Sequence, residues 1–382
     1  MPYDVVVIGA GPSGTVAARV CAERGLSTLC IEEHGTIGYP VQCAGLLSNA
    51  AFAECRVSQR TVLNTVSGAR IVTGAGSELT FDAQATKAYV VDRGALDREM
   101  AEAAAAAGTE FQLKTAVCDV RDSTVITRGI NGREEIPFKI LVAADGPRST
   151  IARLYGFLRA KVYLSGIQAD IPCDCDPRLV ELYPDASPEF FGWKIPTGNG
   201  RARVGLCGQT LVQERFNALL EQTGGTSCVH LVTGTLPLGV MPRTYGHRTL
   251  FVGDAAGFAK PTTGGGVYTG IRSALHAAEV AVSCCEHGAF DDAALADYER
   301  RWQADIGRDL ALGFRLYSLR QKMSSTSIDG LIRALNDPSM IAAIVQYGDM
   351  DRPGTLARKL LKNPRVLRWI TPVLGAAIRS LF

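Results

Sequence analysis

The 382-residue sequence predicts an α/β fold in which a parallel-sheet unit is joined to an antiparallel sheet and to C-terminal helices. Three observations predict it. A buried strand runs directly into a glycine-rich turn and a helix at the N-terminus, strands of alternating polarity fill 157–239, and a long amphipathic helical pattern begins at 291. At roughly 100–200 residues per domain, the length suits two or three domains.

The first element is a strand followed by a phosphate-binding turn. Residues 3–8 (YDVVVI) are apolar and β-branched, as in a strand covered on both faces. GAGPSG follows at 9–14, before a helix. In such a turn Gly9 permits the bend, Gly11 lets the backbone approach a pyrophosphate, and Gly14 lets helix and strand pack closely, while the helix N-terminus attracts phosphate charge. Together these features predict a Rossmann-like unit.

A carboxylate completes this unit. The second strand, LSTLCIEE, reaches Glu32 at the spacing from the glycines where an acid accepts both ribose hydroxyls of a dinucleotide. Glu33 is the alternative, but alternation from Ile31 favours Glu32. An acid here disfavours a 2′-phosphate, so the dinucleotide is FAD or NAD and not NADP. A plain βαβ unit with a glycine turn is the competing interpretation, and it leaves Glu32 unexplained.

A second glycine motif, FVGDAAGFAKPTTGGG at 251–266, decides between FAD and NAD. Asp254 follows a strand, where its carboxylate can accept from ribityl hydroxyls. Gly264–Gly266 open a helix whose N-terminus would face the pyrimidine edge of a flavin and stabilise its anionic reduced form. An NAD dehydrogenase has no use for such a second site, so the sequence predicts FAD; an ordinary glycine-rich loop is the alternative.

Composition excludes several other classes. Lys and Arg number 40 against 38 Asp and Glu, and a net charge of +2 provides no basic field for nucleic acid. Eleven cysteines and five histidines show no zinc-ligand spacing, so we expect no metal and mostly reduced, buried thiols. No run of about 18 uncharged apolar residues is present, and the chain enters its first strand without a signal sequence. We therefore expect a cytoplasmic protein.

The order of these motifs resembles a known fold. GAGPSG, Arg93 in YVVDRGALD, ADG at 144–146 and GDAAG at 253–257 resemble the FAD-dependent fold shared by aromatic hydroxylases and geranylgeranyl reductases. The resemblance covers about residues 3–285. It identifies FAD as the cofactor.

Three features within this group resemble the reductases. Cys43 in YPVQCAG is similar to their cysteine-bearing active-site loop, and GDAAGFAKPTTGGG to their flavin-closing segment. PEFFGWKIP at 188–196 is similar to their P-x-x-Y-x-W-x-F-P substrate motif. Phe191 and Ile195 replace the motif's tyrosine and phenylalanine, so a hydroxyl is lost and the shape of the pocket changes.

The resemblance also implies site residues. For Val117 and Leu46 core packing is the alternative, and for Arg93 a surface charge. Substrate contacts are implied at Phe191, Gly192, Trp193 and Pro196. The glycine motifs and the resemblance together assign FAD contacts to Gly9, Gly11, Ser13, Gly14, Glu32, Cys43, Ala44, Leu46, Arg93, Val117, Asp254, Gly264, Gly265, Gly266 and Val267.

The implied architecture is discontinuous. The FAD-binding domain would comprise 1–65, 86–156 and 240–290, the antiparallel substrate-binding sheet 66–85 and 157–239, and the C-terminal helical region 291–382. Residues 66–85 have the pattern of a hairpin.

The activity that the resemblance implies is FAD-dependent reduction of C=C bonds in geranylgeranyl or polyprenyl chains, with archaeal-type membrane lipids as the first substrate expected. An aromatic monooxygenase, a prenyl-quinone reductase and a lipid-binding flavoprotein without turnover are the alternatives. Because an unactivated alkene needs acid assistance, Cys43 is the expected catalytic proton donor; the alternative is that it only packs against the flavin. The electron donor is left open among ferredoxin, a deazaflavin, NADH and NADPH.

The C-terminal segment 353–382 contains six Lys or Arg and no Asp or Glu, interleaved with apolar residues and Trp369. Such a pattern is typical of an interfacial helix on anionic lipid, which would place the protein peripherally on the cytoplasmic membrane surface. A basic helix packed on the protein itself is the alternative.

Overall fold

The computed structural model describes residues 1–225 and 227–369. Its first sheet has the order β17-β18-β11-β1-β2-β8, in which the strands from β18 to β8 are parallel and β17 is antiparallel. The strands β9 and β10 extend β11 as an antiparallel ribbon. The bounds are β1 (Tyr3–Ile8), β2 (Thr28–Ile31), β8 (Glu110–Gln112), β9 (Ala116–Arg121), β10 (Thr124–Gly129), β11 (Gly132–Ala143), β17 (Tyr245–Gly246) and β18 (Thr249–Phe251).

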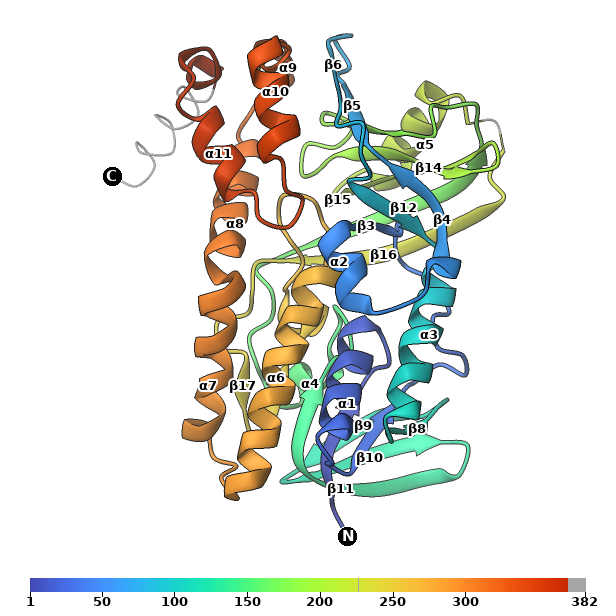
Figure 1. Cartoon of the computed structure of the whole chain (residues 1–382). Coiled ribbons are helices and arrows are strands. Elements are labelled where there is room, and N and C mark those ends of the chain that lie inside the picture. Colours follow the sequence, from blue (N-terminus) through green and yellow to red (C-terminus); the bar gives the residue numbers. More distant parts are fainter. Residues whose placement is uncertain (226, 370–382) are drawn as a thin grey trace.

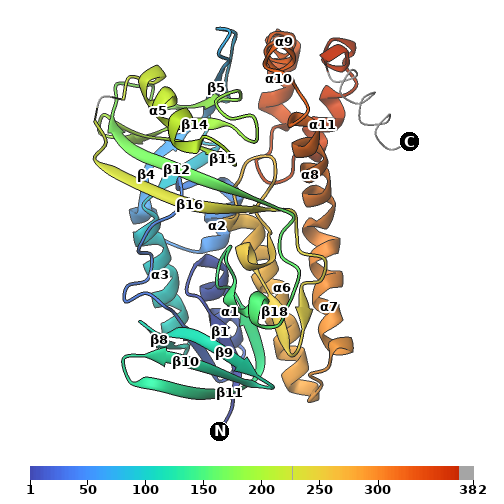
Figure 2. The same cartoon turned by 180° about the vertical axis from the view of Figure 1, so that it is seen from behind.

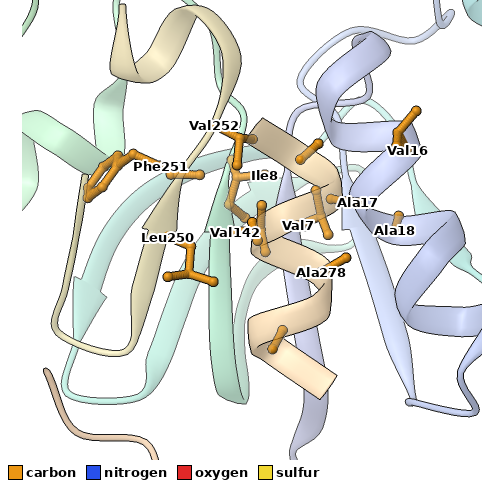
Figure 3. Packing of buried hydrophobic residues seen from close by; sticks show 14 of the residues in the cluster. Val7, Ile8, Val16, Ala17, Ala18, Val142, Leu250, Phe251, Val252 and Ala278 are labelled. Atoms are coloured by element: carbon orange, nitrogen blue, oxygen red, sulfur yellow. The ribbon is translucent and has the colours of Figure 1, made fainter. Parts of the chain in front are cut away.

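Helices α1 (Pro12–Glu23), α3 (Arg93–Ala106) and α6 (Val267–His287) lie beside this sheet (Figure 1). Small residues allow α1 and α6 to approach both the strands and each other. Figure 3 shows side chains of β1, β11 and β18 packed with Ala17 of α1 and Ala278 of α6, and all of them are buried. The predicted Rossmann-like α/β arrangement is therefore confirmed.

The second sheet has the order β16-β12-β15-β14-β13-β5-β6, and helix α5 (Val212–Gln222) packs on β12 and β15. Figure 2 shows it at the opposite end of the molecule from the β9–β11 ribbon. The hairpin expected within 66–85 is the antiparallel pair β5–β6. The bounds are β5 (Gly68–Val72), β6 (Glu78–Asp82), β12 (Val162–Pro172), β13 (Leu179–Tyr183), β14 (Gly192–Gly198), β15 (Arg201–Gly208) and β16 (His230–Leu238).

A third sheet has the order β3-β7-β4 and consists of β3 (Leu46–Ser48), β4 (Val62–Val66) and β7 (Ala88–Val91). Helix α2 (Asn49–Cys55) directly follows β3 in the chain. Two 3-10 turns, Gln59–Thr61 and Gly253–Ala256, and the short helix α4 (Thr150–Leu154) complete the region. The division of the chain into domains stays a prediction.

The helical region expected from 291 contains α7 (Asp292–Trp302), α8 (Arg308–Arg320), α9 (Ser325–Leu335), α10 (Pro338–Tyr347) and α11 (Gly354–Leu360). One π-helical turn, Gln303–Gly307, joins α7 to α8, so the long amphipathic pattern forms a continuous rod along one side of the molecule (Figure 1). Within the described ranges, no helix is long and apolar enough to cross a bilayer.

The described part of the basic C-terminal segment packs against the protein. Val366 is buried, and Trp369 lies so close to Gly330 of α9 that a Cβ there would be 2.5 Å from the indole ring. Lys359 lies over the ring of Tyr347 at 3.8 Å. These contacts favour the packed alternative for 353–369, while the rest of the predicted interfacial segment, 370–382, lies outside the described residues.

Candidate functional site

The three motif glycines of the first turn differ in what surrounds them. A Cβ on Gly9, whose φ is +98°, would be 2.4 Å from the carbonyl oxygen of Ala144. A Cβ on Gly14 would lie against the carbonyl oxygen of Gly9, while a Cβ on Gly11 would meet nothing within 4 Å. Two of the glycines are therefore required by packing, and Gly11 borders open space where a pyrophosphate would approach.

Glu32 lies at the end of β2, beside this turn. Its Oε2 accepts a hydrogen bond from the Ala10 backbone at 2.8 Å, and its Oε1 accepts one from the His34 backbone at 2.9 Å. The side chain is 12% exposed. The carboxylate is thus fixed next to the phosphate turn, where a dinucleotide's ribose would lie.

Ser13 brings the two glycine motifs together. A Cβ on Gly253 or on Gly270 would be 2.5 Å from its Oγ, so α1 touches the start of the second motif and α6 at this point. The Gly253 backbone also donates to Ser273 Oγ at 3.1 Å. The sequence places these motifs about 240 residues apart, and the packing of Ser13 makes them neighbours.

The second motif places a carboxylate against a helix N-terminus. Asp254 Oδ1 lies 2.8 Å from the position of a Cβ on Gly266, the residue that caps α6 without a side-chain hydrogen bond. Burial raises the pKa of Asp254 to about 6, and Arg93 partly offsets this. Gly264, Gly265, Gly266 and Val267 therefore form an electropositive helix start beside an acid, which suits a flavin pyrimidine edge and a ribityl chain.

Arg93 is not a surface charge. At the start of α3, it donates through Nε (3.1 Å) and Nη2 (3.0 Å) to Asp97, and both side chains are 11% exposed. Burial lowers the pKa of Arg93, but the Asp97 carboxylate and the Cys43 sulfur beside it outweigh burial and raise it overall. Arg93 thus links the Cys43 loop to the Asp254 end of the site.

Cys43 lies in a loop held by several groups that the sequence did not single out. The Gly45 backbone donates to Cys43 Sγ at 3.3 Å. Gln168 Nε2, from β12, approaches the Cys43 carbonyl at 3.5 Å. Arg203 Nη1, from β15, donates to the carbonyl of Ala44 at 2.8 Å. The loop is therefore held against the second sheet, and no local pattern could have identified Gln168 or Arg203.

The aromatic motif approaches the same site from the second sheet. Phe191 stacks on Phe190 with centroids 4.3 Å apart and meets Trp193 edge-on at 6.3 Å. Trp193 Nε1 donates to Gln168 Oε1 at 3.1 Å, so one amide joins the tryptophan to the Cys43 loop. A Cβ on Gly264 would lie 3.4 Å from the Phe190 ring. Aromatic side chains thus border the glycine loop directly.

The remaining predicted residues are placed less centrally. Ala44 and Leu46 share an apolar cluster with Trp193. Gly192 faces α5, since a Cβ there would be 2.7 Å from Leu219. Pro196 lies four residues further along the same strand and therefore on the same face. Val117 lies on β9, half-buried against the main core. Of the substrate-motif residues, Trp193 reaches the cysteine loop through Gln168 and its cluster with Ala44 and Leu46, and Phe191 packs on Trp193.

These residues fit FAD: open space at Gly11 for the pyrophosphate, an anchored carboxylate at Glu32 for the ribose, and a helix start at Gly266 for the pyrimidine edge. Comparison with known families supports this. The FAD binding domain family matches residues 2–215.

Two curated relatives extend over nearly the whole chain. Digeranylgeranylglycerophospholipid reductase 2 of Methanothermobacter thermautotrophicus is 32% identical over 98% of this chain and all of its own length. The chain belongs to this reductase family. A digeranylgeranylglycerophospholipid reductase of Methanocaldococcus jannaschii is 29% identical over 97% of this chain and 98% of its own. Membership confirms FAD as the cofactor and an FAD-dependent oxidoreductase as the class of enzyme.

Solved structures agree on the fold. A geranylgeranyl bacteriochlorophyll reductase-like protein from Thermoplasma acidophilum superposes with a TM-score of 0.84 at 25% identity, covering 94% of this chain and 99% of its own. A p-nitrophenol 4-monooxygenase from Pseudomonas putida reaches a TM-score of 0.72 at 16% identity, covering 91% of this chain and 97% of its own. The second likeness shows the fold alone.

In the described residues, no group of three His, Cys, Asp or Glu could hold a metal ion.

Proposed function

We propose that this family member reduces C=C bonds in the geranylgeranyl chains of archaeal-type glycerophospholipids. The observation that carries the proposal is the unbroken series of contacts from the Gly264 loop through Phe190 and Phe191 to Trp193 and the Cys43 loop. The aromatic side chains suit a prenyl chain, and the Cys43 thiol at the end of this series is available to supply a proton. The names of the curated relatives support the same substrate class.

Reduced FAD, when bound, supplies a hydride to one alkene carbon. The chain's own task is to deliver a proton to the other carbon, because charge develops there and acid assistance lowers the barrier. We assign the proton to Cys43 Sγ. The Gly45 N–H donates to this sulfur and the Arg93 guanidinium lies beside it, so both stabilise the thiolate that remains after transfer.

The other residues bind and orient. Gln168 fixes the Cys43 loop relative to Trp193 through one amide. The aromatic cluster excludes water from the alkene, which protects the proton transfer. As electron donor we propose ferredoxin, a deazaflavin or NAD(P)H. We also propose that the C-terminal segment contacts membrane lipid.

The test is anaerobic turnover of the FAD-loaded enzyme reduced by dithionite. Geranylgeranyl glycerophospholipids should gain mass in steps of two hydrogens, read by mass spectrometry. Matched incubations contain a prenylated quinone or, under air with NADPH, a phenol. Reduction of the quinone alone would identify a prenyl-quinone reductase, and oxygen insertion into the phenol would identify an aromatic monooxygenase; either result overturns the proposal.

A further inference from the structure

A buried ion pair lies behind the glycine loop at the start of α6. Lys260 Nζ contacts the Asp351 carboxylate and donates to the Met350 carbonyl at 3.1 Å. Lys260 is 7% and Asp351 4% exposed. A buried ammonium is costly unless it is paired, so this pair requires an account beyond surface charge.

Lys260 is joined to the glycine loop by its backbone as well as its side chain. Its N–H donates to the Gly265 carbonyl at 3.1 Å, and its carbonyl accepts from Gly264 at 2.8 Å. A Cβ on Gly265 would be 3.3 Å from Nζ, and the three atoms closest to that position are two of Lys260 and the Thr263 hydroxyl. The ammonium is therefore the positive charge that lies directly against Gly265, while the Asp254 carboxylate lies against Gly266.

Asp351 is held on the side away from the loop. Its Oδ2 accepts from Ser48, the residue whose Oγ also caps α2 at Ala51. Asp309 and Arg352 line the same small hollow. The connection between α10 and α11 thus fixes Lys260 in place and links the glycine loop to Ser48 at the end of β3.

We propose that Lys260 is a positioning residue for the flavin: held by Asp351 behind Gly264–Gly266, its positive charge adds to the α6 N-terminus and favours the reduced, anionic cofactor over the oxidised one. The physical basis is that a fixed charge in a water-excluded site acts on charge that develops nearby. The inference rests on the FAD cofactor and is independent of which substrate is reduced.

The experiment measures the flavin midpoint potential of FAD-loaded protein by spectroelectrochemistry. In Lys260→Met, the ratio of the affinity for reduced FAD to the affinity for oxidised FAD should fall at least tenfold. For a two-electron couple this lowers the midpoint potential by about 30 mV. Lys260→Arg should restore the wild-type potential, because it keeps the charge. Lys322→Met, which removes an exposed lysine at the end of α8, is the matched control and should leave the potential unchanged.

Asp351→Asn separates charge from packing. The substitution disturbs the contacts between residues 260 and 351 but keeps the Lys260 ammonium. The flavin midpoint potential of this variant should therefore rise or stay at the wild-type value. If Lys260→Met alone does not retain FAD, the double variant Lys260→Met/Asp351→Asn removes both buried charges, and its potential should lie below that of Asp351→Asn. An unchanged potential without the ammonium, or an equal fall in Lys260→Met and Asp351→Asn, overturns the proposal.

Discussion

Gly11 is the motif glycine whose side of the turn is free of protein atoms, since a Cβ there meets nothing within 4 Å. Gly11→Val should therefore leave the fold intact but abolish FAD binding, because the branched side chain occupies the space of the pyrophosphate. Gly14→Val is the contrasting variant, as its Cβ would collide with the Gly9 carbonyl, and it should lower the melting temperature strongly. FAD content and thermal unfolding distinguish the two. A Gly11→Val protein that purifies with a full complement of FAD would show that the cofactor lies elsewhere.

The Cys43 sulfur accepts a hydrogen bond from the Gly45 N–H and lies beside the Arg93 guanidinium. Cys43→Ser should keep FAD and its reduction by dithionite, because the backbone contacts of the loop remain. Alkene reduction should slow by about 10²–10⁴-fold, the range for loss of a general acid. Stopped-flow flavin reduction and lipid mass spectrometry measure the two steps separately. Turnover equal to wild type would leave Cys43 as a packing residue.

The buried carboxyl group of Asp254 makes the stability of the FAD-free protein depend on pH. Burial raises its pKa from 3.8 to about 6 in the folded state. Between these values the native state holds a proton that the unfolded chain has released, so this group makes the FAD-free protein less stable as pH rises through that window. Asp254→Asn should raise the free energy of unfolding of FAD-free protein at pH 8 by up to about 3 kcal/mol, and the gain should vanish below about pH 4. Urea unfolding at both pH values provides the comparison, and equal stabilities at pH 8 would contradict the assignment.

At the scale of elements, α8 holds the loop that leads into the aromatic motif. Arg320 donates to the backbone carbonyls of Pro184, Ser187 and Pro188, the Ser187 contact being 2.8 Å. The same helix supplies Tyr317, whose ring lies 6.4 Å from Phe190. A helix distant in the chain therefore shapes the surface that we propose binds the prenyl chain.

Arg320→Met should loosen this loop without touching the FAD site. The lost charged hydrogen bonds should raise KM for the lipid by about tenfold while kcat changes less, since the reacting groups stay in place. Arg315→Met, an exposed arginine on the same helix, is the matched control. Steady-state kinetics and FAD content test this. An unchanged KM, or a fall in kcat alone, would exclude the loop from substrate binding.

At the scale of the whole molecule, the basic C-terminal segment contains residues that pack against the protein and exposed cations that we propose contact lipid. Val366 is buried and Trp369 rests on Gly330, whereas Lys362 and Arg368 are exposed. Truncation of the segment would remove both kinds of residue together. Substitution of the exposed cations is therefore the sharper test of membrane contact.

Lys362→Gln/Arg368→Gln should keep the fold and FAD but bind anionic vesicles about 30-fold more weakly at low salt, because each basic side chain near the surface contributes about 1 kcal/mol. High salt should reduce the difference. Arg315→Gln/Lys322→Gln removes the same charge elsewhere and should bind as wild type. Flotation with phosphatidylglycerol vesicles measures this, and equal flotation of the two double variants would leave the segment a packed structural element.

The sequence by itself determined the cofactor and the local geometry of the turns that we expect to bind it. The turn at 9–14, Glu32 and the Asp254 motif each act through backbone conformation and short-range spacing, and such features are written in consecutive residues. Cys43 and Trp193 were predicted as site residues from the resemblance of short motifs. The long amphipathic pattern after 291 also follows from local periodicity, although its single π-helical turn does not.

Only the tertiary structure decided which of these parts meet. Ser13 against Gly253, Gln168 between Trp193 and Cys43, and Lys260 paired with Asp351 are contacts between segments far apart in the chain. A glutamine in a strand or a lysine in a loop carries no local signal of its partner. Their placement depends on how the sheets and the C-terminal helices pack, because burial of a polar group becomes favourable only once its distant partner is in position.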